Sequence, residues 1–299
     1  MNIIAVDAGG TKARFALYNL EGINLHQIET ESVHPLSIGY EGMAQKLKEG
    51  IDALKVLSTE KIELISFGLA GYGQDPKIRL EIETALKKSF KDEIWIIHND
   101  VEIALMASLQ HTDGIMLVAG TGSIALRSIK GHKMRAGGWG YLIGDEGAAY
   151  WMGRKLLSCF SKMADGRIQK SSLYDLVMDA LVLDEASDVI LHLNNHPKPK
   201  EAIASLAKLL NLAADRKDPV ALEIFDQAAY ELSLLVKALH YESVERIPVK
   251  ATGGVFESKA YIIEPLKKYL GQEYQLDMTE NPPIYGAYLF AKELLENKG

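Results

Sequence analysis

The sequence IIAVDAGGTK, residues 3–12, decides how the rest of the chain is interpreted. Its apolar run predicts a buried strand that ends at Asp7, and a second strand-like run follows the two glycines. Glycine lets backbone N–H groups approach an anion closely. Thr11 and Lys12 add a hydroxyl and a positive charge, and Asp7 is placed to hold a divalent metal through water. These parts suit a nucleotide phosphate with Mg²⁺, although an ordinary glycine-rich hairpin explains the same letters and the spacing of a P-loop is absent.

Composition and charge narrow the class of protein. Of the 299 residues 47% are hydrophobic and 24% charged, which is typical of a soluble globular protein with room for two domains. A net charge of −7 disfavours nucleic-acid or anionic-membrane binding as the main activity. No apolar run reaches the ~20 residues of a spanning helix, and a core strand begins at once, so we expect a cytoplasmic protein without a signal peptide. The single cysteine, Cys159, excludes an intrachain disulfide.

The pattern of the first 30 or so residues returns in the middle of the chain. Residues 2–32 contain three strand-like runs, and residues 114–138 repeat the order strand, Gly/Thr turn, strand, turn, strand. The repeat predicts two similar α/β domains, residues 1–112 and 113–284, the second with a helical insertion. The closing helix, 285–299, is expected to pack back on the first domain. A ligand is expected between the domains, because domain interfaces are favoured ligand sites.

Three Gly/Thr turns, each after a strand-like run, carry a family resemblance. They are DAGGTK at 7–12, AGTGS at 119–123 and TGGV at 252–255, with HND at 98–100 between the first two. Together with GGWGYLIGDEGAAYWMG at 137–153, they resemble the acetate-and-sugar-kinase/Hsc70/actin superfamily, and within it the N-acetylglucosamine kinase branch of the BadF-BadG-BcrA-BcrD ATPase family. The resemblance covers the whole chain. It implies two ribonuclease H-like (actin-like ATPase) domains with an interdomain cleft, ATP and Mg²⁺ as cofactors, and a homodimer.

By this resemblance the three turns bind the nucleotide. The first turn holds the metal and the γ-phosphate side, the second wraps the β-phosphate, and the third flanks the adenosine. Asp7 would position Mg²⁺ through water. Asn211 and Tyr230 lie on helices that could flank the base, but no feature of the sequence singles them out. The implied ATP- and phosphate-binding residues are Gly9, Gly10, Thr11, Lys12, Gly120, Thr121, Gly122, Gly253 and Gly254.

Asp100 follows the strand-like run at 94–98 and matches the position of the family's catalytic base. A carboxylate at the end of a strand can accept the proton of a sugar hydroxyl as the phosphoryl group arrives. Asp is also a favourable helix N-cap, and a helical stretch begins at Val101. The two roles are compatible, and the catalytic role is the one that the resemblance implies.

The resemblance also implies the residues that surround the sugar. Asp145 matches an acid that binds sugar hydroxyls, for which a carboxylate is a strong acceptor, with a helix cap as the alternative. Gly138 and Trp139 are expected to line the sugar pocket, with an ordinary core tryptophan as the alternative. Ser123 is expected to contact phosphate or the sugar's 2-substituent. The implied sugar-binding residues are His34, Asn99, Asp100, Ser123, Gly138, Trp139 and Asp145.

His34 departs from the family pattern, which usually has an Asn near this Pro to contact sugar hydroxyls. Histidine can still donate or accept a hydrogen bond, but its size and titration differ. A surface-loop histidine is the alternative interpretation. The departure leaves the substrate open among N-acetylglucosamine, glucosamine, N-acetylmannosamine, N-acetylmuramic acid and glucose.

The function that the sequence predicts is an ATP-dependent hexosamine kinase that phosphorylates a hydroxyl, O6, of N-acetylglucosamine or a related amino sugar. One alternative is an ATPase activator that passes electrons from an iron–sulfur cluster, but one Cys per chain cannot supply four thiolates in a dimer. The other is a non-catalytic sugar and ATP sensor. Sugar-kinase-like repressors begin with a DNA-binding segment, whereas this chain begins with a core strand and is acidic. Neither a nucleic acid nor a membrane is expected as a partner.

Overall fold

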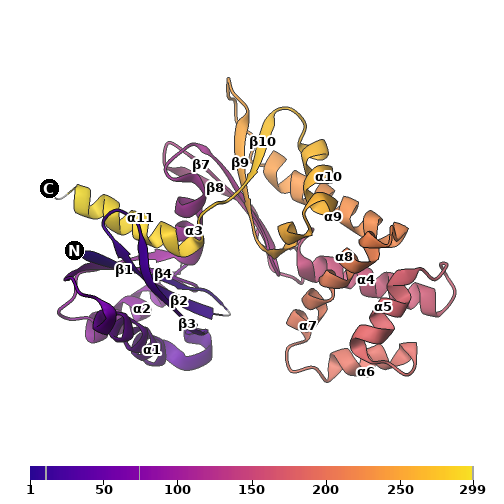
Figure 1. The fold of residues 1–299 in the computed structure, drawn as a ribbon, viewed down its shortest axis with the longest axis horizontal. Helices are drawn as coiled ribbons and strands as arrows, with labels where there is room; N and C mark the ends of the chain where they lie inside the picture. Colours follow the sequence, from indigo (N-terminus) through magenta and orange to yellow (C-terminus); the bar gives the residue numbers. More distant parts are fainter. Residues whose placement is uncertain (11, 74, 298–299) are drawn as a thin grey trace. The chain divides into compact units, whose positions relative to one another are not determined.

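The chain forms two compact units in the computed structural model, which describes residues 1–10, 12–73 and 75–297 (Figure 1). Unit 1 comprises Met1–His111 and the segment from Thr279 onward, and unit 2 comprises Thr112–Met278. Each unit contains one five-stranded sheet with helices, which confirms the predicted α/β class. Among the described residues, no helix combines the length and apolar character that a bilayer crossing requires.

Unit 1 is built on a sheet of order β3-β2-β1-β4-β5. β1 pairs antiparallel with β2, and β2 with β3, whereas β4 and β5 run parallel to β1. The carboxyl ends of β1, β4 and β5 therefore lie at one edge of the sheet. The strands are β1 (Asn2–Ala8), β2 (Lys12–Asn19), β3 (Asn24–Glu31), β4 (Ile62–Leu69) and β5 (Trp95–Asn99).

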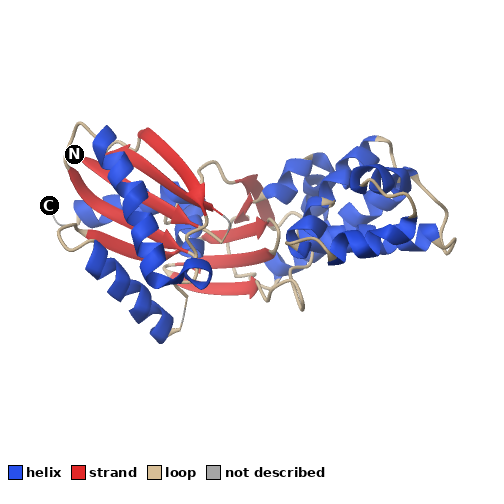
Figure 2. Cartoon of the chain, turned by 90° about the horizontal axis from the view of Figure 1, so that it is seen from below, coloured by secondary structure: helices blue, strands red, loops and turns tan. Residues whose placement is uncertain are grey.

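Helices cover both faces of this sheet (Figure 2). Ile4 and Val6 of β1 pack in a core with residues of α1 and α2, and Ile3 and Ala5 pack on the other face with residues of α3 and α11. All four side chains are fully buried, which explains why β1 is a continuous apolar run without alternation. The helices are α1 (Pro35–Leu57), α2 (Pro76–Ser89), α3 (Asp100–Leu109) and α11 (Pro283–Glu296).

The C-terminal helix α11 lies directly against α3. A Cβ atom built on Gly286 would lie 1.8 Å from the carbonyl oxygen of Ile103, so a side chain at this position would force the two helices apart. α3 begins with Asp100. The last helix of the chain therefore helps to fix the helix that carries the predicted catalytic acid.

Unit 2 repeats the strand arrangement of unit 1. Its sheet has the order β10-β9-β6-β7-β8, in which β6, β7 and β8 are antiparallel neighbours and β9 and β10 run parallel to β6. The predicted echo between the two halves is therefore present in the fold. The strands are β6 (Gly114–Ala119), β7 (Ser123–Ile129), β8 (His132–Gly137), β9 (Ile247–Thr252) and β10 (Tyr274–Met278).

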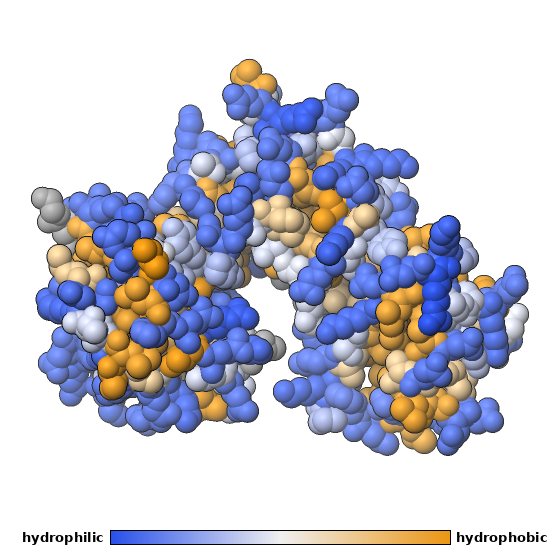
Figure 3. All heavy atoms as spheres, viewed as in Figure 1, coloured by the Kyte–Doolittle hydropathy of each residue, from blue (hydrophilic) through white to orange (hydrophobic). Residues whose placement is uncertain are grey.

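A large group of helices belongs to unit 2. One continuous apolar core joins these helices to β6 and β9. Apolar residues also reach the surface over α5 and α6, where Val182, Ile190 and Leu191 are exposed (Figure 3). The helices are α4 (Ala149–Ala164), α5 (Ser172–Leu181), η1 (Ala186–Asp188), α6 (Val189–Asn194), α7 (Pro199–Ser205), α8 (Ala207–Asp215), α9 (Pro219–Lys237), η2 (Gly254–Ser258) and α10 (Ala260–Leu270).

Candidate active site

Asp100 lies at the carboxyl edge of the unit 1 sheet, as the first residue of α3. The N-cap of this helix is Asn99, whose Oδ1 accepts the N–H of Val101 at 2.9 Å. Glu102 completes a capping box, because its carboxylate accepts the N–H of Asn99 at 3.1 Å. The interpretation of Asp100 as the N-cap is therefore wrong, and the helix has its cap without the Asp100 carboxylate.

Asn99, predicted to contact the sugar, is engaged on both ends of its side chain. Its Oδ1 caps α3, and its Nδ2 donates to the carbonyl oxygen of Tyr72 at 3.2 Å. Tyr72 lies in the loop that follows β4. Asn99 therefore ties the end of β5 to the loop after β4 and holds Asp100 in place.

The Asp100 carboxyl has an electrostatic environment that suits proton transfer. Burial raises its pKa above the ordinary value, while the N–H groups of Val101 and of Asp100 itself, and the electrostatic influence of the His34 ring, oppose the increase. A carboxylate with a raised pKa is a stronger proton acceptor than an exposed one. Perturbed carboxyl groups of this kind are common at functional sites.

Asp7 lies at the same edge of the sheet, near the end of β1, with β4 between that strand and β5, which Asp100 follows. Burial raises the pKa of Asp7 to about 6; Arg14 opposes the increase and the Asp100 carboxylate adds to it. The Arg14 Nη1 lies 3.8 Å from Asp7 Oδ2. The Asp100 carboxylate thus raises the proton affinity of Asp7, and a bound cation would oppose that effect.

His34 occupies the N-cap of α1 and is not an ordinary surface-loop residue. Its Nδ1 accepts the N–H of Leu36 at 3.2 Å, so the neutral ring must carry its proton on Nε2. The Nε2 atom lies beside Gly71, 3.2 Å from where a Cβ would stand. Because His34 also acts on the pKa of Asp100, its ring lies close to the predicted catalytic residue, and Nε2–H is a hydrogen-bond donor there.

In the described part of the first turn, neither packing nor backbone conformation requires a glycine at position 10. A Cβ built there meets no atom within 4 Å, and the φ angle of Gly10 lies outside the left-handed region. Open space at a glycine is what close approach of a ligand requires. Gly9 donates its N–H to the carbonyl oxygen of Lys12 at 3.0 Å, and the Lys12 amine pairs with Glu29. Thr11, predicted to bind phosphate, lies outside the described residues.

The second turn, Gly120–Ser123, packs against the side chain of Asp145 in unit 2. The Asp145 carboxylate is buried, and Oδ1 lies 3.4 Å from the N–H of Ser123. A Cβ on Gly122 would lie 2.5 Å from Asp145 Oδ2, which explains why residue 122 is a glycine. The Ser123 hydroxyl, predicted to face a ligand, is buried and donates to the Glu146 carbonyl oxygen at 2.7 Å.

Asp145 does not cap the following helix, because the N-cap of α4 is Ala148. The alternative interpretation of Asp145 is therefore wrong. The residue has a φ angle of +63°, which is uncommon for an amino acid other than glycine. Strain of this kind persists where the surrounding structure enforces it, and it is concentrated at functional sites.

Trp139 is not a core tryptophan, since 65% of its surface is exposed. The guanidinium of Arg135 lies 4.9 Å from the centre of its ring. Gly138 precedes it with a φ angle of +70°, and a side chain there would collide with Ile124. The exposed ring is thus presented on a rigid glycine turn, as a surface that a ligand can contact.

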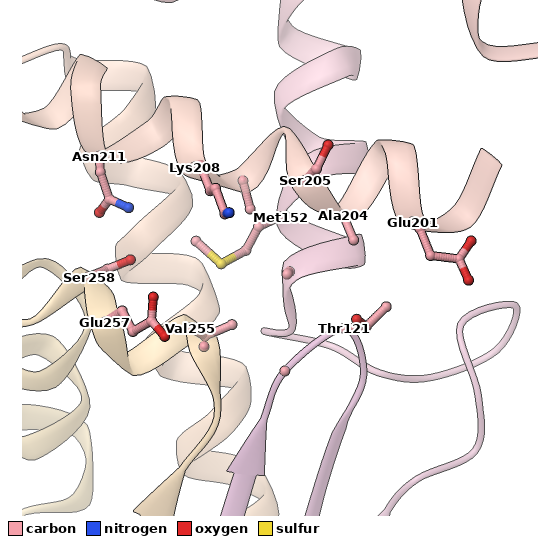
Figure 4. Close-up of a pocket in the computed structure, with 14 residues that line it drawn as sticks. Thr121, Met152, Glu201, Ala204, Ser205, Lys208, Asn211, Val255, Glu257 and Ser258 are labelled. Atoms are coloured by element: carbon pink, nitrogen blue, oxygen red, sulfur yellow. The ribbon is translucent and has the colours of Figure 1, made fainter. Parts of the chain in front are cut away.

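The second and third turns border one cavity of about 450 Å³ in unit 2 (Figure 4). Gly120, Thr121 and Gly254 line it, whereas Gly253 lies behind them, where a Cβ would be 2.3 Å from the carbonyl oxygen of Ala119. The structure therefore gives the paired glycines different surroundings. Gly253 lets two turns approach each other, and Gly254 borders open space in which a Cβ would meet no atom within 4 Å.

Sequence reasoning missed most of the side chains that line this cavity. The sulfur of Met152 and the amine of Lys208 point into it from α4 and α8 (Figure 4). Asn211 lines the cavity as well, but Tyr230 does not and instead packs on Tyr269. No spacing in α7 or α8 distinguishes a cavity-facing residue from a solvent-facing one. The remaining lining residues are Ala149, Glu201, Ala204, Ser205, Ala207, Val255, Glu257 and Ser258.

Comparison with known proteins gives relatives that span nearly the whole chain. An N-acetylmuramic acid/N-acetylglucosamine kinase of Clostridium acetobutylicum is 30% identical, over 97% of this chain and 98% of its own. An N-acetyl-D-glucosamine kinase of Dictyostelium discoideum is 28% identical, over 96% and 97%. The crystal structure of a candidate N-acetylglucosamine kinase from Chromobacterium violaceum has a TM-score of 0.78 and 26% identity, and covers 97% of this chain and 98% of its own.

A family model matches residues 4–291, which is most of the sequence. The match includes all three Gly/Thr turns and both Asp7 and Asp100. Together with the relatives, it confirms the family and the kinase class that the sequence predicts. The chain belongs to the BadF/BadG/BcrA/BcrD ATPase family.

Proposed function

We propose that the chain is an ATP-dependent amino-sugar kinase that phosphorylates O6 of N-acetylglucosamine. The observation that carries the proposal is the environment of Asp100, a partly buried acid with a raised pKa whose carboxylate is not needed to cap its helix. The named activities of the two curated relatives agree with this substrate. Asp100 accepts the proton of the sugar hydroxyl as that oxygen attacks the γ-phosphorus.

The cavity of unit 2 holds the nucleoside in this proposal. Its buried floor of Met152, Ala204 and Val255 suits an aromatic base, and polar side chains surround the floor. Backbone N–H groups of the turns that contain Gly120 and Gly10 receive phosphate oxygens, because no side chain obstructs either glycine. Thr11, Lys12, Thr121 and Gly122 keep the phosphate-binding roles predicted from the sequence.

The remaining sugar contacts come from residues whose placement leaves a usable group. His34 donates through Nε2–H, and the exposed ring of Trp139 offers an apolar surface to the sugar's 2-substituent. The surface is supported in unit 2 by Asp145, Ser123 and Gly138. Asp145 and Ser123 hold the second turn, and Gly138 forms the turn before Trp139.

Mg²⁺ fits the acids at the carboxyl edge of the unit 1 sheet. Burial raises the pKa of both Asp7 and Asp100, and Arg14 does not offset this effect on Asp7. A bound cation would favour the charged form of both carboxyl groups. The described residues contain no group of three His, Cys, Asp or Glu arranged around one point. Asp7 would therefore hold Mg²⁺ mostly through water, which is the usual manner for this ion. When bound, the ion neutralises charge on the phosphates.

The test is an ADP-release assay with ATP, Mg²⁺ and a panel of N-acetylglucosamine, glucosamine, N-acetylmannosamine and glucose. We expect N-acetylglucosamine to raise ADP release well above the rate with ATP alone. NMR of the product should place the phosphate on C6. If no sugar in the panel raises ADP release, the kinase assignment is wrong and the sensor alternative gains support.

A further inference from the structure

Tyr141 is an aromatic residue of unit 2 that the proposed mechanism leaves unused. It lies two residues after Trp139, in the loop between β8 and α4. The loop closes on itself there, because the N–H of Gly144 donates to the carbonyl oxygen of Gly140 at 2.9 Å. A Cβ on Gly144 would lie 3.0 Å from the Cβ of Trp139. Trp139 and Tyr141 therefore belong to one short turn, residues 139–144, which we call the tryptophan turn.

The large apolar side chains of the tryptophan turn differ in their exposure to solvent. Leu142 and Ile143 are 78% and 77% exposed, and Trp139 is 65% exposed. Tyr141 is 36% exposed, which is the lowest fraction of the four. Tyr141 is therefore the large side chain of this turn that packs most closely on the rest of unit 2.

Two side chains from different helices hold the Tyr141 ring. The Tyr150 ring meets it edge to face, with 5.0 Å between the ring centres and an angle of 76° between the ring planes. The Lys200 amine lies 4.9 Å from the centre of the Tyr141 ring, within the range of a cation–π contact. Tyr150 belongs to α4 and Lys200 to α7, and both helices contribute residues to the wall of the unit 2 cavity. Tyr141 thus joins the tryptophan turn to the helices that border the proposed nucleoside site.

The contact with Tyr150 leads directly to the second Gly/Thr turn. The N–H of Tyr150 donates to the carbonyl oxygen of Thr121 at 3.3 Å, and the N–H of Ala149 donates to that of Gly120 at 2.9 Å. The backbone of Tyr150 is fixed on the turn that is proposed to bind phosphate, and its ring contacts Tyr141. The position of the tryptophan turn is therefore set relative to the phosphate-binding turn.

A fixed separation between these two turns matters for an amino sugar. In a hexose, C6 and the 2-substituent lie on opposite sides of the ring, at a distance that the ring determines. A sugar whose O6 is aligned with the γ-phosphate therefore places its 2-substituent at one defined point, and a surface for that group has to be held there. A glycine-rich turn without an anchor would not hold it, because glycine leaves the backbone many conformations.

We propose that Tyr141 positions Trp139 to select the N-acetyl group of the sugar. The inference rests on the proposed kinase function and deepens it, by naming a residue that decides between N-acetylglucosamine and glucosamine. Tyr141 contacts neither substrate; it holds the indole ring where the acetyl methyl group packs on it. The guanidinium of Arg135 already lies 4.9 Å from the centre of that ring, which disfavours the ammonium group of glucosamine at the same place.

The experiment measures kcat/KM for N-acetylglucosamine and for glucosamine, at saturating ATP, in the natural protein, Tyr141→Leu and Tyr141→Phe. The ratio of the two values cancels general damage to the enzyme. We expect the natural ratio to exceed one and to fall about tenfold in Tyr141→Leu, mainly through the KM for N-acetylglucosamine. Tyr141→Phe keeps the ring and should keep the ratio. Trp139→Leu should lower the ratio, and adding Tyr141→Leu should lower it no further, because Tyr141 acts through Trp139.

A matched control exists in the same unit. Tyr230 meets Tyr269 edge to face, with 5.3 Å between the ring centres, and does not line the cavity. Tyr230→Leu removes the same kind of contact and should leave the ratio unchanged. Lys200→Met is a milder variant that removes only the cation from the Tyr141 ring, and we expect a smaller fall in the ratio. It keeps the inference testable if thermal unfolding shows that Tyr141→Leu does not fold.

The other outcomes overturn the inference in recognisable ways. If the natural protein phosphorylates both sugars equally well, or prefers glucosamine, the kinase function stands and the role of Tyr141 is wrong. An unchanged ratio in folded Tyr141→Leu, or in Lys200→Met where Tyr141→Leu does not fold, contradicts the positioning role, as does an equal fall in Tyr230→Leu or in Tyr141→Phe. A further fall in the double variant would show that Tyr141 does not act through Trp139. If neither sugar is phosphorylated, the proposed function fails and this inference fails with it.

Discussion

Units 1 and 2 share one strand arrangement but surround it with different chemistry. In unit 1 the carboxyl edge of the sheet gathers ionisable groups: Asp7, Asp100, His34 and Arg14. In unit 2 the Gly/Thr turns border a cavity whose floor is buried and apolar, with Met152 and Val255 at its centre. In the proposed function, the repeated fold serves proton and metal chemistry in unit 1 and nucleoside binding in unit 2.

The acids of the two units show the difference most directly. The pKa of Asp7 in unit 1 is raised to about 6, because the effect of burial is larger than the opposing effect of the positive charge on Arg14. Asp218 in unit 2 is also buried, but hydrogen bonds from Ser171, Ser172 and backbone N–H groups outweigh burial and lower its pKa. An acid that the fold fully satisfies is structural, whereas an acid left with a raised pKa is available to a ligand.

The largest expected effect is that of Asp100→Asn, which keeps the shape of unit 1 and removes its proposed base. We expect kcat to fall by about 10²–10⁴-fold, the usual cost of losing a positioned base. Affinity for ATP, measured by titration calorimetry, should stay within about twofold of the natural value if unit 2 binds the nucleoside. A variant with near-normal turnover would show that the base lies elsewhere.

The second prediction contrasts Asp7→Asn with Asp218→Asn in urea unfolding. Since the folded pKa of Asp7 is above its unfolded value of 3.8, natural stability is lost as pH rises from about 4 to 6. Asp7→Asn should therefore be more stable at pH 7.5, by on the order of 2 kcal/mol, with no difference near pH 4. Asp218→Asn should be less stable at pH 7.5 and should recover relative to the natural protein as pH falls through the ordinary Asp range. Equal behaviour of the two variants would remove the distinction between the acids.

The third prediction uses two neighbouring glycines of unit 2 with different surroundings. Gly253→Ala should lower the free energy of unfolding by about 1–2 kcal/mol, because the added Cβ meets the Ala119 carbonyl at a φ angle of +115°. Gly254→Val should leave unfolding unchanged and raise the KM for ATP about tenfold, because the side chain occupies the cavity. Thermal unfolding and ATP titration of both variants check this. If Gly254→Val binds ATP normally, the cavity is not the nucleotide site.

Much of the fold was predictable because it depends on local chemistry. The apolar run before Asp7, the glycine turns and the repeat at residues 114–138 each leave a pattern in the letters. The Asp residues at strand ends could be found for the same reason. In the first unit, even the helix face of Met43, Leu47, Ile51 and Leu54 is buried as its periodicity predicts.

The residues that sequence reasoning missed depend on contacts between distant segments. Met152 and Lys208 belong to different helices and line one cavity only after folding. The N-cap of α3 is Asn99 and not Asp100. Both residue types are good caps, so only the backbone geometry decides between them. Periodicity contains none of this information.

The smallest expected effect concerns His34, where the two roles of one side chain can be separated. Asn and Asp both cap helices as well as any residue, so His34→Asn and His34→Asp should each preserve the start of α1. Only Asn retains an N–H donor, in place of the Nε2–H that the ring presents beside Asp100. We therefore expect His34→Asp to raise the KM for the sugar by about three- to tenfold, the cost of one lost hydrogen bond, and His34→Asn to raise it less. Both variants should melt within a few degrees of the natural protein. If both raise KM equally while remaining folded, the donor is irrelevant and His34 belongs with the structural residues of unit 1.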